Sequence, residues 1–543
     1  MPNEFFEVPK PQNEPYLSYA PGTQDRKELK KQLEELKSKE IEIPAIIGGK
    51  EVRTDRKFDV VMPHNHSHKL ATAYFCNEEQ VNDAIESALE ARKEWAETSW
   101  EHRVSVFKKA ADLVTGPYRY MLNAATMLGQ SKTPHQAEIE AIGELADFLR
   151  FNAYYMEKIM AEQPYSPPNL WNRVEYRPLE GFIFAVTPFN FVAIAGNLPS
   201  APAMAGNVAL WKPAPASIYA NYYFMKILQE AGLPDGVINF LPGEGPDVGD
   251  PVLESPDLSG LHFTGSLGTF RNLWKGIGER IEKYKYFPRI VGETGGKDFI
   301  FAHNSADVDA MVVASIRGAY EYQGQKCSAA SRMYVPESIW EEFRDKLLAE
   351  VKNVKYGDVE DFTNFMGAVI DRKAFEKISG YIDYAKESDD AEILFGGNYD
   401  DSRGYFIEPT IVQTSDPKFK LMEEEIFGPV LTIYVYKDQD FEDTLKLCDE
   451  TSPYGLTGAV FAQDRYAIQQ MANYLRNTAG NFYINDKPTA AIVNQQPFGG
   501  ARLSGTNDKA GSVGHMMRWL SMRAIKENTV PAKNWDYPYM QDE

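Results

Sequence analysis

The sequence predicts an α/β fold with two doubly wound, parallel-sheet domains in series. Short runs rich in β-branched and aromatic residues alternate with helical patterns, first from residue 181 and again after residue 299, as βαβ units do. These runs are mostly apolar, as strands buried on both faces of a parallel sheet are. The chain has 543 residues, more than a single hydrophobic core usually serves. We therefore expect two α/β domains joined near residues 293 to 300.

The predicted elements follow the chain in a simple order. Residues 1–45 form an extended arm and a charged surface helix, "DRKELKKQLEELKSKE",. Helical patterns dominate from about 78 to 160,. The first strand series is "GFIFAV", "NVALWKP", "VINFLPG" and "LSGLHFTGS", and the second is "SRMYVP", "GPVLTIYVY" and "GLTGAVFA". We place the first domain at residues 46–298, the second at 299–490, and a return to the first at 491–543.

The composition is that of a globular protein in a reducing compartment. Cys76, Cys327 and Cys448 are odd in number and far apart, so neither a disulfide framework nor a zinc site is indicated. A net charge of −21 argues against a nucleic-acid partner or an anionic membrane surface. No apolar run approaches the roughly 20 residues of a membrane span. The acidic, proline-rich start resembles neither a signal nor a transit peptide, so we expect a cytoplasmic protein, with the mitochondrial matrix, as a processed form, as the alternative.

Three histidines, His64, His66 and His68 in "VMPHNHSHK", suggest a metal site at first sight. No acidic or cysteine ligand flanks them, and Pro63 favours a turn. We interpret the segment as a surface hairpin and expect no metal.

Cys327 stands in "YQGQKCSAAS", beside Gln325, Lys326 and Ser328. A structural cysteine usually has apolar neighbours. These polar neighbours suit a thiol that ionises and reacts. The alternative is that Cys327 fills space where a strand meets a loop.

Polar residues follow the candidate strands of the first series, where α/β sheets present ligand-facing groups. Asn190 in "VTPFNFVAIAGNLP" can donate to a developing oxyanion, or else cap a helix or form an Asx-turn. Lys212 in "LWKPAPAS" can hold ribose hydroxyls or phosphate, or else be solvated. Ser266 in "FTGSLGTF" can meet a pyrophosphate at a helix N-terminus. Neither this motif nor "LPGEGPDVG" matches the G-x-G-x-x-G fingerprint, and both are compatible with tight turns.

Two carboxylates stand beside turns. Glu293 in "VGETGGKDF" ends a candidate strand, and Gly295 and Gly296 allow a close backbone approach,. A carboxylate near a thiol can serve as a general base. Glu425 in "MEEEIFGPV" precedes an apolar turn and by itself is compatible with a solvated acidic run.

Seven motifs occur in one order: "PFNF", "WKPAP", "FTGS", "ETGGK", "GQKCSA", "EEIFGP" and "QQPFGG". Together they resemble the motif set of the aldehyde dehydrogenase superfamily, over about residues 45 to 530. The wording of "FNFVAIAGNL", "GQKCSAASR", "INDKPT" and "PFGGARLSGTNDKAG" is similar to one branch, the 1-pyrroline-5-carboxylate dehydrogenases. The resemblance implies the aldehyde dehydrogenase type of fold, with residues 46–298 as the NAD(P)-binding domain, 299–490 as the catalytic domain, and a small β oligomerisation element.

The resemblance also implies an activity: NAD(P)-dependent oxidation of L-glutamate γ-semialdehyde, the open form of 1-pyrroline-5-carboxylate, to L-glutamate in proline catabolism. In the family, the cysteine matching Cys327 attacks the aldehyde to give a thiohemiacetal and then a thioester, Asn190 and the cysteine N–H stabilise the oxyanion, and Glu293 activates the hydrolytic water. NAD is the expected cofactor. NADP stays open, because many NAD-preferring relatives carry a glutamate where Pro215 stands,.

The remaining site residues are assigned by the same resemblance. The cofactor-binding residues are Thr187, Lys212, Gly265, Ser266, Leu267, Gly268, Thr269, Glu425 and Phe427. The substrate-binding residues are Ser328, Ala490, Ala491, Phe498, Phe191 and Glu144. Ser328 and the N–H groups of Ala490 and Ala491, in a loop matching "PTAAIV", hold the substrate α-carboxylate. Relatives have glycine where Ala490 stands, which a left-handed backbone would require.

The resemblance implies a homo-oligomer, at least a dimer, built from a hairpin near residues 163 to 180 and the segment after about 515. Three other functions stay open. One is the same chemistry on another aldehyde. Another is a cysteine hydrolase or acyltransferase, which needs a histidine near Cys327 in the fold. The third is a non-catalytic binding protein, which loss of the nucleophile or the base would indicate; both residues are present.

Overall fold

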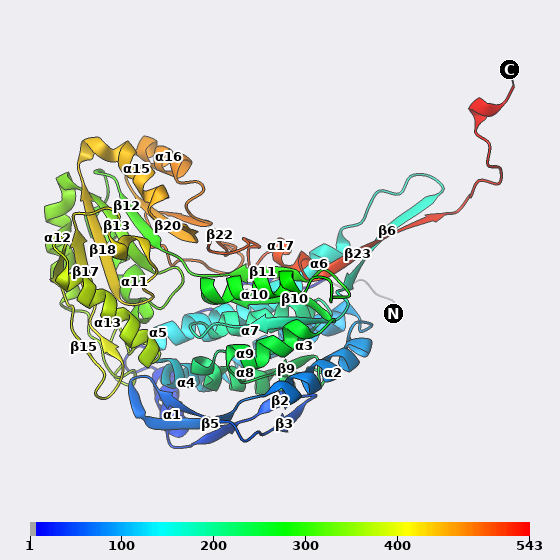
Figure 1. The fold of residues 1–543 in the computed structure, drawn as a ribbon, viewed down its shortest axis with the longest axis horizontal. Coiled ribbons are helices and arrows are strands. Elements are labelled where there is room, and N and C mark those ends of the chain that lie inside the picture. Colours follow the sequence, from blue (N-terminus) through cyan, green and yellow to red (C-terminus); the bar gives the residue numbers. More distant parts are fainter. Residues whose placement is uncertain (1–6, 543) are drawn as a thin grey trace.

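The computed structural model describes residues 7–542, which form two sheet-based bodies and an outlying pair of strands (Figure 1). The first body holds a seven-stranded sheet of order β11-β10-β7-β8-β9-β2-β3. Its strands are β2 (Ala45–Ile47), β3 (Lys50–Val52), β7 (Phe182–Val186), β8 (Val208–Lys212), β9 (Ile238–Phe240), β10 (Leu258–Thr264) and β11 (Arg289–Glu293). The five strands from β7 to β11 are parallel, and β2 and β3 extend one edge antiparallel.

Helices cover both faces of this sheet because its crossovers change direction. The chain moves from β7 to β9 through α7 (Val192–Met204) and α8 (Ile218–Ala231), then returns through α9 (Gly245–Glu254) and α10 (Leu267–Glu279). Since βαβ crossovers are right-handed, the two pairs of helices lie on opposite faces. The remaining helices of this body are α2 (Glu78–Trp95), α3 (Trp100–Thr115), α4 (Arg119–Gln130), α5 (Pro134–Ala137) and α6 (Leu145–Ala161).

A π-helical segment, η1 (Glu138–Glu144), joins α5 to α6 without a break. π-helical turns are rare and are frequently found at functional sites. Here the wider turn buries Glu138 and Glu140 in the body's interior, and Glu144 at its end lines the cavity described below.

The second body holds a seven-stranded sheet of order β14-β17-β18-β13-β12-β20-β21, parallel except for β14 at its edge. Its strands are β12 (Asp298–Ala302), β13 (Ala330–Pro336), β14 (Ala391–Phe395), β17 (Thr410–Thr414), β18 (Val430–Tyr436), β20 (Thr457–Phe461) and β21 (Asn481–Ile484). Its helices are α11 (Val308–Tyr320), α12 (Glu337–Val351), α13 (Arg372–Glu387), α14 (Lys420–Glu423), α15 (Phe441–Glu450) and α16 (Arg465–Tyr474). Phe299 and Phe301 of β12 pack into one hydrophobic cluster, and Ile300 and Ala302 into another, so this sheet is buried on both faces.

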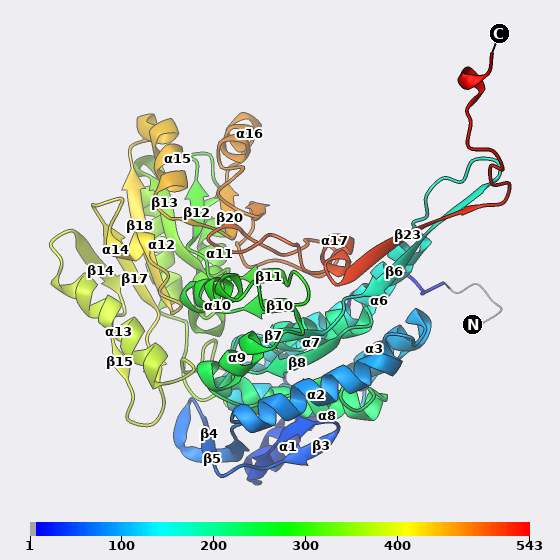
Figure 2. The same cartoon turned by 45° about the vertical axis from the view of Figure 1, so that its right-hand side comes forward.

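The chain passes from the first sheet to the second between the end of β11 at Glu293 and the start of β12 at Asp298. Figure 2 shows the two bodies side by side, with the second sheet above β10 and β11. The predicted α/β class, the parallel sheets and the candidate strands of both series are confirmed.

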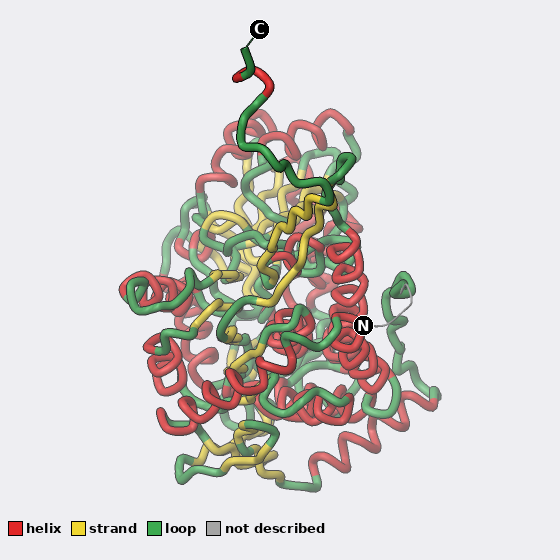
Figure 3. The backbone as a smooth tube through the Cα atoms, turned by 90° about the vertical axis from the view of Figure 1, so that its right-hand side faces the viewer, coloured by secondary structure: helices red, strands yellow, loops and turns green. Residues whose placement is uncertain are grey.

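Two strands far apart in sequence form a ribbon that extends from the first body. β6 (Leu170–Pro178) pairs antiparallel with β23 (Leu520–Asn528) along its whole length, and Figure 3 shows them crossing the near face side by side. The two segments predicted to form one element, near residues 163 to 180 and after about 515, do lie together, although the strand partner of β6 is β23 and not a second strand within residues 163 to 180. α17 (Val513–Met517) precedes β23 and contacts α6.

The N-terminal region is more buried than its composition predicts. α1 (Gln24–Lys37) packs against α4 and buries Leu29, Leu33 and Leu36, so three leucines on one face suffice to dock this charged helix. β1 (Ile41–Ile43), β5 (Asn65–Tyr74) and β4 (Lys57–Met62) form a small sheet in that order.

The histidine segment forms the expected β4–β5 hairpin, but His64 at its turn is buried rather than exposed. His66 and His68 hydrogen-bond the carbonyls of Asp401 and Lys37. Within residues 7–542, no group of three or more histidine, cysteine, aspartate or glutamate side chains is arranged to hold a metal ion. None of the helices in the same range is both long and apolar enough to cross a membrane.

Candidate active site

Cys327 lies in the tight loop between the 3₁₀ turn η3 (Glu321–Gly324) and β13. Tyr322, Gln323 and Gly324 in this loop have consecutive positive φ angles of 51°, 55° and 66°, a backbone that non-glycine residues seldom adopt and that surrounding contacts must hold in place. Gln323 Nε2 supplies two such contacts, donating to the carbonyls of Ser131 and Ala368.

The polar sequence around Cys327 does not favour the thiolate in the structure. Burial, followed by the negative charge of Asp298, Glu293 and Glu425, raises the pKa of Cys327 well above that of a free thiol. Lys326 Nζ is paired with Glu321 Oε2 at 2.8 Å, and both are buried. The interpretation that polar neighbours let Cys327 ionise is therefore wrong, because the adjacent cation is already neutralised.

Cys327 lines two cavities at once. One, of about 350 Å³, is bounded by α6, the Cys327 loop and the loop after β21, and all the predicted substrate-binding residues line it: Glu144, Phe191, Ser328, Ala490, Ala491 and Phe498. The other, of about 420 Å³, lies at the carboxyl ends of β7 and β10 and is lined by Thr187, Asn190, Gly265, Ser266, Thr269, Glu425 and Phe427 from the predicted set. The fold thus brings most of the predicted residues to two sides of one thiol.

Three of the predicted cofactor-binding residues lie outside the second cavity. Leu267 and Gly268 open α10 and line an adjoining hollow together with Ser266 and Glu425. Lys212 ends β8, and its carbonyl accepts a hydrogen bond from the N–H of Thr187 at 3.1 Å. Its side chain is buried, and burial lowers its pKa to about 8, so the alternative of a solvated lysine is wrong.

Asn190 is positioned by the Cys327 loop. It is buried at the carboxyl end of β7, and its Nδ2 donates to the carbonyl of Gln325 at 3.1 Å. The N-cap of α7 is Phe191, with no side-chain cap bond. The alternative of a helix cap is therefore wrong for Asn190, whose amide is directed towards the nucleophile loop.

Glu293 is held in a slot made by glycines. Its Oε2 accepts a hydrogen bond from the N–H of Gly500 at 3.0 Å. A Cβ on Gly499 would come within 2.9 Å of Glu293 Oε1, so the two glycines of "QQPFGG" leave just enough room for the carboxyl group. Burial raises the pKa of Glu293 well above its usual range. Its side chain is not among the groups lining either cavity.

Glu425 approaches the backbone through the glycines of "ETGGK". Its Oε1 accepts from the N–H of Gly296 at 3.0 Å, and a Cβ on Gly295 would lie 2.1 Å from the same carboxylate. A Cβ on Gly296 would lie 2.6 Å from the carbonyl of Cys327. Glu425 is thus part of the site rather than of a solvated acidic run, and these glycines are required by close approach.

The second cavity offers groups suited to a dinucleotide. Ser266 is the N-cap of α10, and its Oγ accepts from the N–H of Thr269 at 3.2 Å. The first turn of this helix therefore presents its remaining N–H groups and positive dipole end to the cavity, an arrangement that favours phosphate. A Cβ on Gly268 would meet no atom within 4 Å, so the turn is open to a ligand.

The substrate-side cavity also has residues that the motifs did not indicate. Tyr16, His135, Asp147, Lys326 and Lys487 line it. Lys487 Nζ donates to the carbonyl of Thr489 at 2.9 Å and so supports the loop that holds Ala490. Neither Ala490 nor Ala491 has a positive φ, so the backbone at Ala490 is not left-handed and does not require glycine. A lysine beside a nucleophile was visible in the sequence; the arm that brings Tyr16 here was not.

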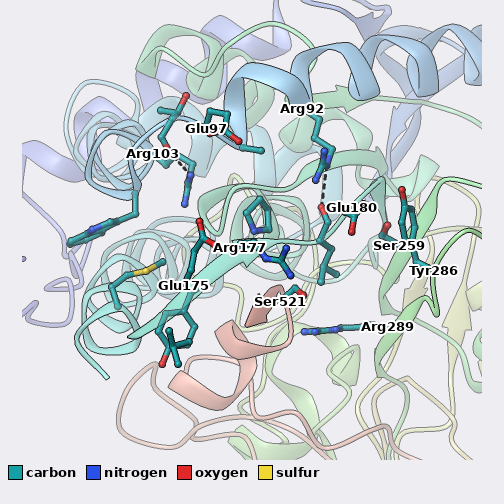
Figure 4. A pocket seen from close by; sticks show the side chains of 18 of the residues that line it. Arg92, Glu97, Arg103, Glu175, Arg177, Glu180, Ser259, Tyr286, Arg289 and Ser521 are labelled. Atoms are coloured by element: carbon teal, nitrogen blue, oxygen red, sulfur yellow. Dashed lines mark hydrogen bonds between the residues drawn. The ribbon is translucent and has the colours of Figure 1, made fainter. Parts of the chain in front are cut away.

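A further cavity, of about 720 Å³, lies where β6 leaves the first body (Figure 4). Arg92, Arg103, Arg177 and Arg289 line it, and Arg92 donates to the carbonyl of Leu179. None of its lining residues borders the two cavities at Cys327. It contains no cysteine and no predicted site residue, so it is separate from the site around Cys327.

Comparison with known proteins gives the same picture. The model of the aldehyde dehydrogenase family matches residues 51–525. A protein named delta-1-pyrroline-5-carboxylate dehydrogenase, mitochondrial, from Dictyostelium discoideum is 52% identical over 540 residues, covering 98% of this chain and 96% of its own length. The protein of the same name from Homo sapiens is 50% identical over 530 residues, covering 97% and 94%.

Solved structures show the same likeness. The delta-pyrroline-5-carboxylate dehydrogenase from Mycobacterium tuberculosis bound with NAD is 48% identical and covers 99% of this chain and 100% of its own, with a TM-score of 0.97. A 1-pyrroline-5-carboxylate dehydrogenase from Thermus with bound NAD is 31% identical, with a TM-score of 0.89 and coverage of 97% and 100%. The family model matches most of the chain, the relatives are about half identical along nearly its whole length, and the fold is the same. The chain therefore belongs to the aldehyde dehydrogenase family.

Proposed function

We propose that the protein oxidises L-glutamate γ-semialdehyde, the open form of 1-pyrroline-5-carboxylate, to L-glutamate with NAD. The observation that supports this most directly is the position of Cys327 in the wall common to two cavities, one suited to a dinucleotide and one lined by charged groups. The relatives of about 50% identity bear the name of this activity. NAD is bound in the structures from Mycobacterium tuberculosis and Thermus.

The chemistry begins at Cys327. The thiol first gives its proton to water; the Sγ of the thiolate then bonds to the aldehyde carbon while the carbonyl π electron pair moves to oxygen, which gives a thiohemiacetal oxyanion. The side-chain N–H of Asn190 and the N–H of Cys327 donate to that oxygen. Because the pKa of the Cys327 thiol is raised, forming the thiolate costs free energy. The two N–H donors offset this cost by stabilising the oxyanion, and such donors have their largest effect in a site from which bulk water is excluded.

When bound, NAD would supply the hydride acceptor for the carbon attached to Cys327, and loss of that hydride leaves a thioester on Cys327. Thr187, Gly265, Ser266, Leu267, Gly268, Thr269, Glu425, Phe427 and Lys212 would hold NAD. The first turn of α10 would hold its pyrophosphate, and Glu425 would hold its ribose. The element after β8 has Pro215 in a 3₁₀ turn (Pro215–Ser217), so no carboxylate at that position disfavours a 2′-phosphate.

Glu293 completes the reaction as the base that activates water. The water oxygen bonds to the thioester carbon, its proton passes to the Glu293 carboxylate, and Cys327 leaves as thiolate. The carboxyl must be ionised to act, although burial favours its neutral form. Rotation out of the Gly499–Gly500 slot towards the thioester would expose it to water and favour ionisation.

The α-carboxylate of the substrate has donors ready in the first cavity. Ser328 Oγ has no hydrogen-bond partner among residues 7–542, and the N–H groups of Ala490 and Ala491 donate to no group in the same range. We call residues 488–493 the anchor loop. Phe191 and Phe498 would flank the aliphatic stem, and Glu144 lines the same cavity.

The assembly and the location follow from related features. Trp171 on β6 and Met522 on β23 are 57% and 59% exposed, and a ribbon with exposed apolar side chains favours a homodimer, which light scattering of the purified protein would test.

The names of the relatives favour the mitochondrial matrix over the cytoplasm, and cell fractionation with an antibody to the chain would decide between them.

The activity is tested by turnover of 1-pyrroline-5-carboxylate with NAD and with NADP separately, followed by the absorbance of the reduced nicotinamide. We expect reduction with NAD. Absence of reduction with either cofactor would overturn the proposal, whereas oxidation of simple aldehydes alone would leave the family assignment and remove the substrate.

A further inference from the structure

The N-terminal arm, residues 7–22, has no helix or strand but is tied to the helical segment that borders the substrate-side cavity. The N–H groups of Val8, Glu14 and Leu17 donate to carboxylates of that segment, namely Glu157 at 2.5 Å, Asp147 at 2.9 Å and Glu138 at 2.9 Å. Figure 2 shows the blue N-terminal end of the described arm beside α6. The arm is therefore docked along η1 and α6 by its backbone.

Buried charges strengthen this docking. Arg119 donates to Glu138 and Glu14 and to the carbonyl of Pro15. Tyr19 Oη donates to Glu138 Oε2 at 2.6 Å. Charge-assisted hydrogen bonds between buried groups are among the stronger ones, so the middle of the arm has one defined path.

That path places Tyr16 in the wall of the substrate-side cavity. Its ring packs on Gly143 of the π-helical segment, where a Cβ would lie 2.3 Å from Tyr16 Cε1. Burial and the charges of Glu144 and Asp147 raise the pKa of Tyr16 to about 12, so its hydroxyl stays neutral. The arm is part of the cavity rather than an appendage.

Asn13 joins the arm to the anchor loop. Its Nδ2 donates to Asp147 Oδ2 at 2.7 Å and to the carbonyl of Val493, the last residue of the loop, at 2.9 Å. Its Oδ1 accepts from Gln495 Nε2 at 3.0 Å. One side chain thus bridges α6 to both sides of Asn494, which has a positive φ of 68° and is also held by Tyr155.

We propose that Asn13 is a positioning residue that fixes the anchor loop, so that the N–H groups of Ala490 and Ala491 meet the substrate carboxylate. This inference rests on the proposed function, because it assigns the loop to a charged substrate. Asn13 itself does not line the cavity; it acts through the loop. Without the hydrogen bonds of Asn13, the anchor loop would be less ordered in the free protein, and substrate binding would have to order it each time. The loss would therefore weaken substrate binding and would not slow the chemical step.

The contact between Asn13 and the anchor loop is tested by hydrogen–deuterium exchange of the unliganded protein, measured by mass spectrometry of the peptide that spans residues 488–496. Asn13→Ala should increase deuterium uptake in this peptide. The matched control is Gln12→Ala, an exposed neighbour with no hydrogen bond among residues 7–542, which should leave uptake as in the parent. Unchanged uptake in Asn13→Ala would overturn the proposal without reference to any substrate.

The consequence is tested by kinetics. Asn13→Ala should raise KM for glutamate semialdehyde roughly tenfold, the loss expected from one or two hydrogen bonds. The kcat, the KM for NAD and the KM for an uncharged aldehyde of equal length should stay as in the parent. A merely structural role of the arm would lower the melting temperature and change both aldehydes alike.

Gln495→Ala removes only one of the three bonds and should change exchange and KM in the same direction by a smaller factor, which keeps the test available should Asn13→Ala fold poorly. Raised exchange with unchanged KM for the charged substrate would overturn the positioning role. No turnover of glutamate semialdehyde by the parent would overturn the proposed function and the kinetic part of this inference together, while the exchange measurement still decides whether Asn13 fixes the loop.

Discussion

The side-chain amide of Asn190 donates to the carbonyl of Gln325 at 3.1 Å, two residues before the cysteine that lines both cavities. This bond fixes the amide of one body against the nucleophile loop of the other. The remaining amide hydrogen is thereby oriented in the site without further reorganisation, which is what stabilisation of a developing oxyanion requires.

Replacement of this amide should slow turnover. We expect Asn190→Ala to lower kcat on the order of 100- to 1,000-fold, since one preorganised donor to the oxyanion is lost. The measurement is the steady-state rate of nicotinamide reduction, with NAD binding followed by fluorescence as the control for folding. A kcat within a few-fold of the parent would rule out the role of Asn190 in the oxyanion site.

Cys327 should be the only thiol that turnover requires. Cys327→Ala should abolish nicotinamide reduction while NAD binding persists, because the aldehyde has no nucleophile. Cys76→Ala and Cys448→Ala are the matched controls, since both of these thiols are fully buried away from the cavities, and burial raises the pKa of each to about 12. Activity in Cys327→Ala would contradict the mechanism.

Glu293 should act after hydride transfer. With Glu293→Gln the thioester should accumulate, so stopped-flow absorbance should show a burst of reduced nicotinamide followed by near-arrest. Because burial raises the pKa of Glu293 and the base must be ionised, steady-state kcat of the parent should increase as pH rises above the usual range of a carboxyl group. Steady turnover at the parent rate in Glu293→Gln would be incompatible with the role.

Selectivity for a carboxylate should depend on Ser328. Each charge-assisted hydrogen bond contributes about 1.5 to 3 kcal/mol, so an aldehyde of equal length without the carboxylate should have at least about a tenfold lower kcat/KM. Ser328→Ala should narrow this gap by affecting glutamate semialdehyde more than the uncharged aldehyde. Equal kcat/KM for both aldehydes in the parent would reject the carboxylate contact.

Glu144 should make the free protein less stable at alkaline pH. Burial, together with Glu140 nearby, raises the pKa of Glu144 from its ordinary value near 4.5 to about 8. Between these values the folded state keeps a proton that the unfolded state has lost, so the free energy of unfolding falls as pH rises. Glu144→Gln should therefore raise the melting temperature by about 1 to 3 °C more at pH 9 than at pH 5. An equal change at both pH values would contradict the raised pKa.

The strands of both sheets could be predicted from the sequence because their apolar runs are local signals. "GFIFAV" and "GPVLTIYVY" form β7 and β18 as expected. The short edge strands β2 and β3, by contrast, exist because β9 offers an edge to pair with, and no local pattern indicates that edge. The π-helical segment 138–144 has the same cause, since buried partners such as Lys132 for Glu140 hold it.

The site divides in the same way. Ser266 could be placed at a helix N-terminus from its neighbours alone, and the structure has it there, as the N-cap of α10. The raised pKa of Cys327 could not, because it depends on Asp298, Glu293 and Glu425, which only the fold brings together. Asn13 lies 480 residues from its acceptor Val493, so no spacing in the sequence links them.

The cysteine common to two cavities also constrains the order of events. Cys327 borders two cavities, so the aldehyde and the dinucleotide have separate binding spaces beside one sulfur atom. Initial-rate patterns should then show that an inert analogue of either ligand leaves the binding of the other intact, and reduced cofactor can exchange while the acyl group is still attached. Two separate cavities at one cysteine therefore allow the reduced cofactor to dissociate before the thioester is hydrolysed.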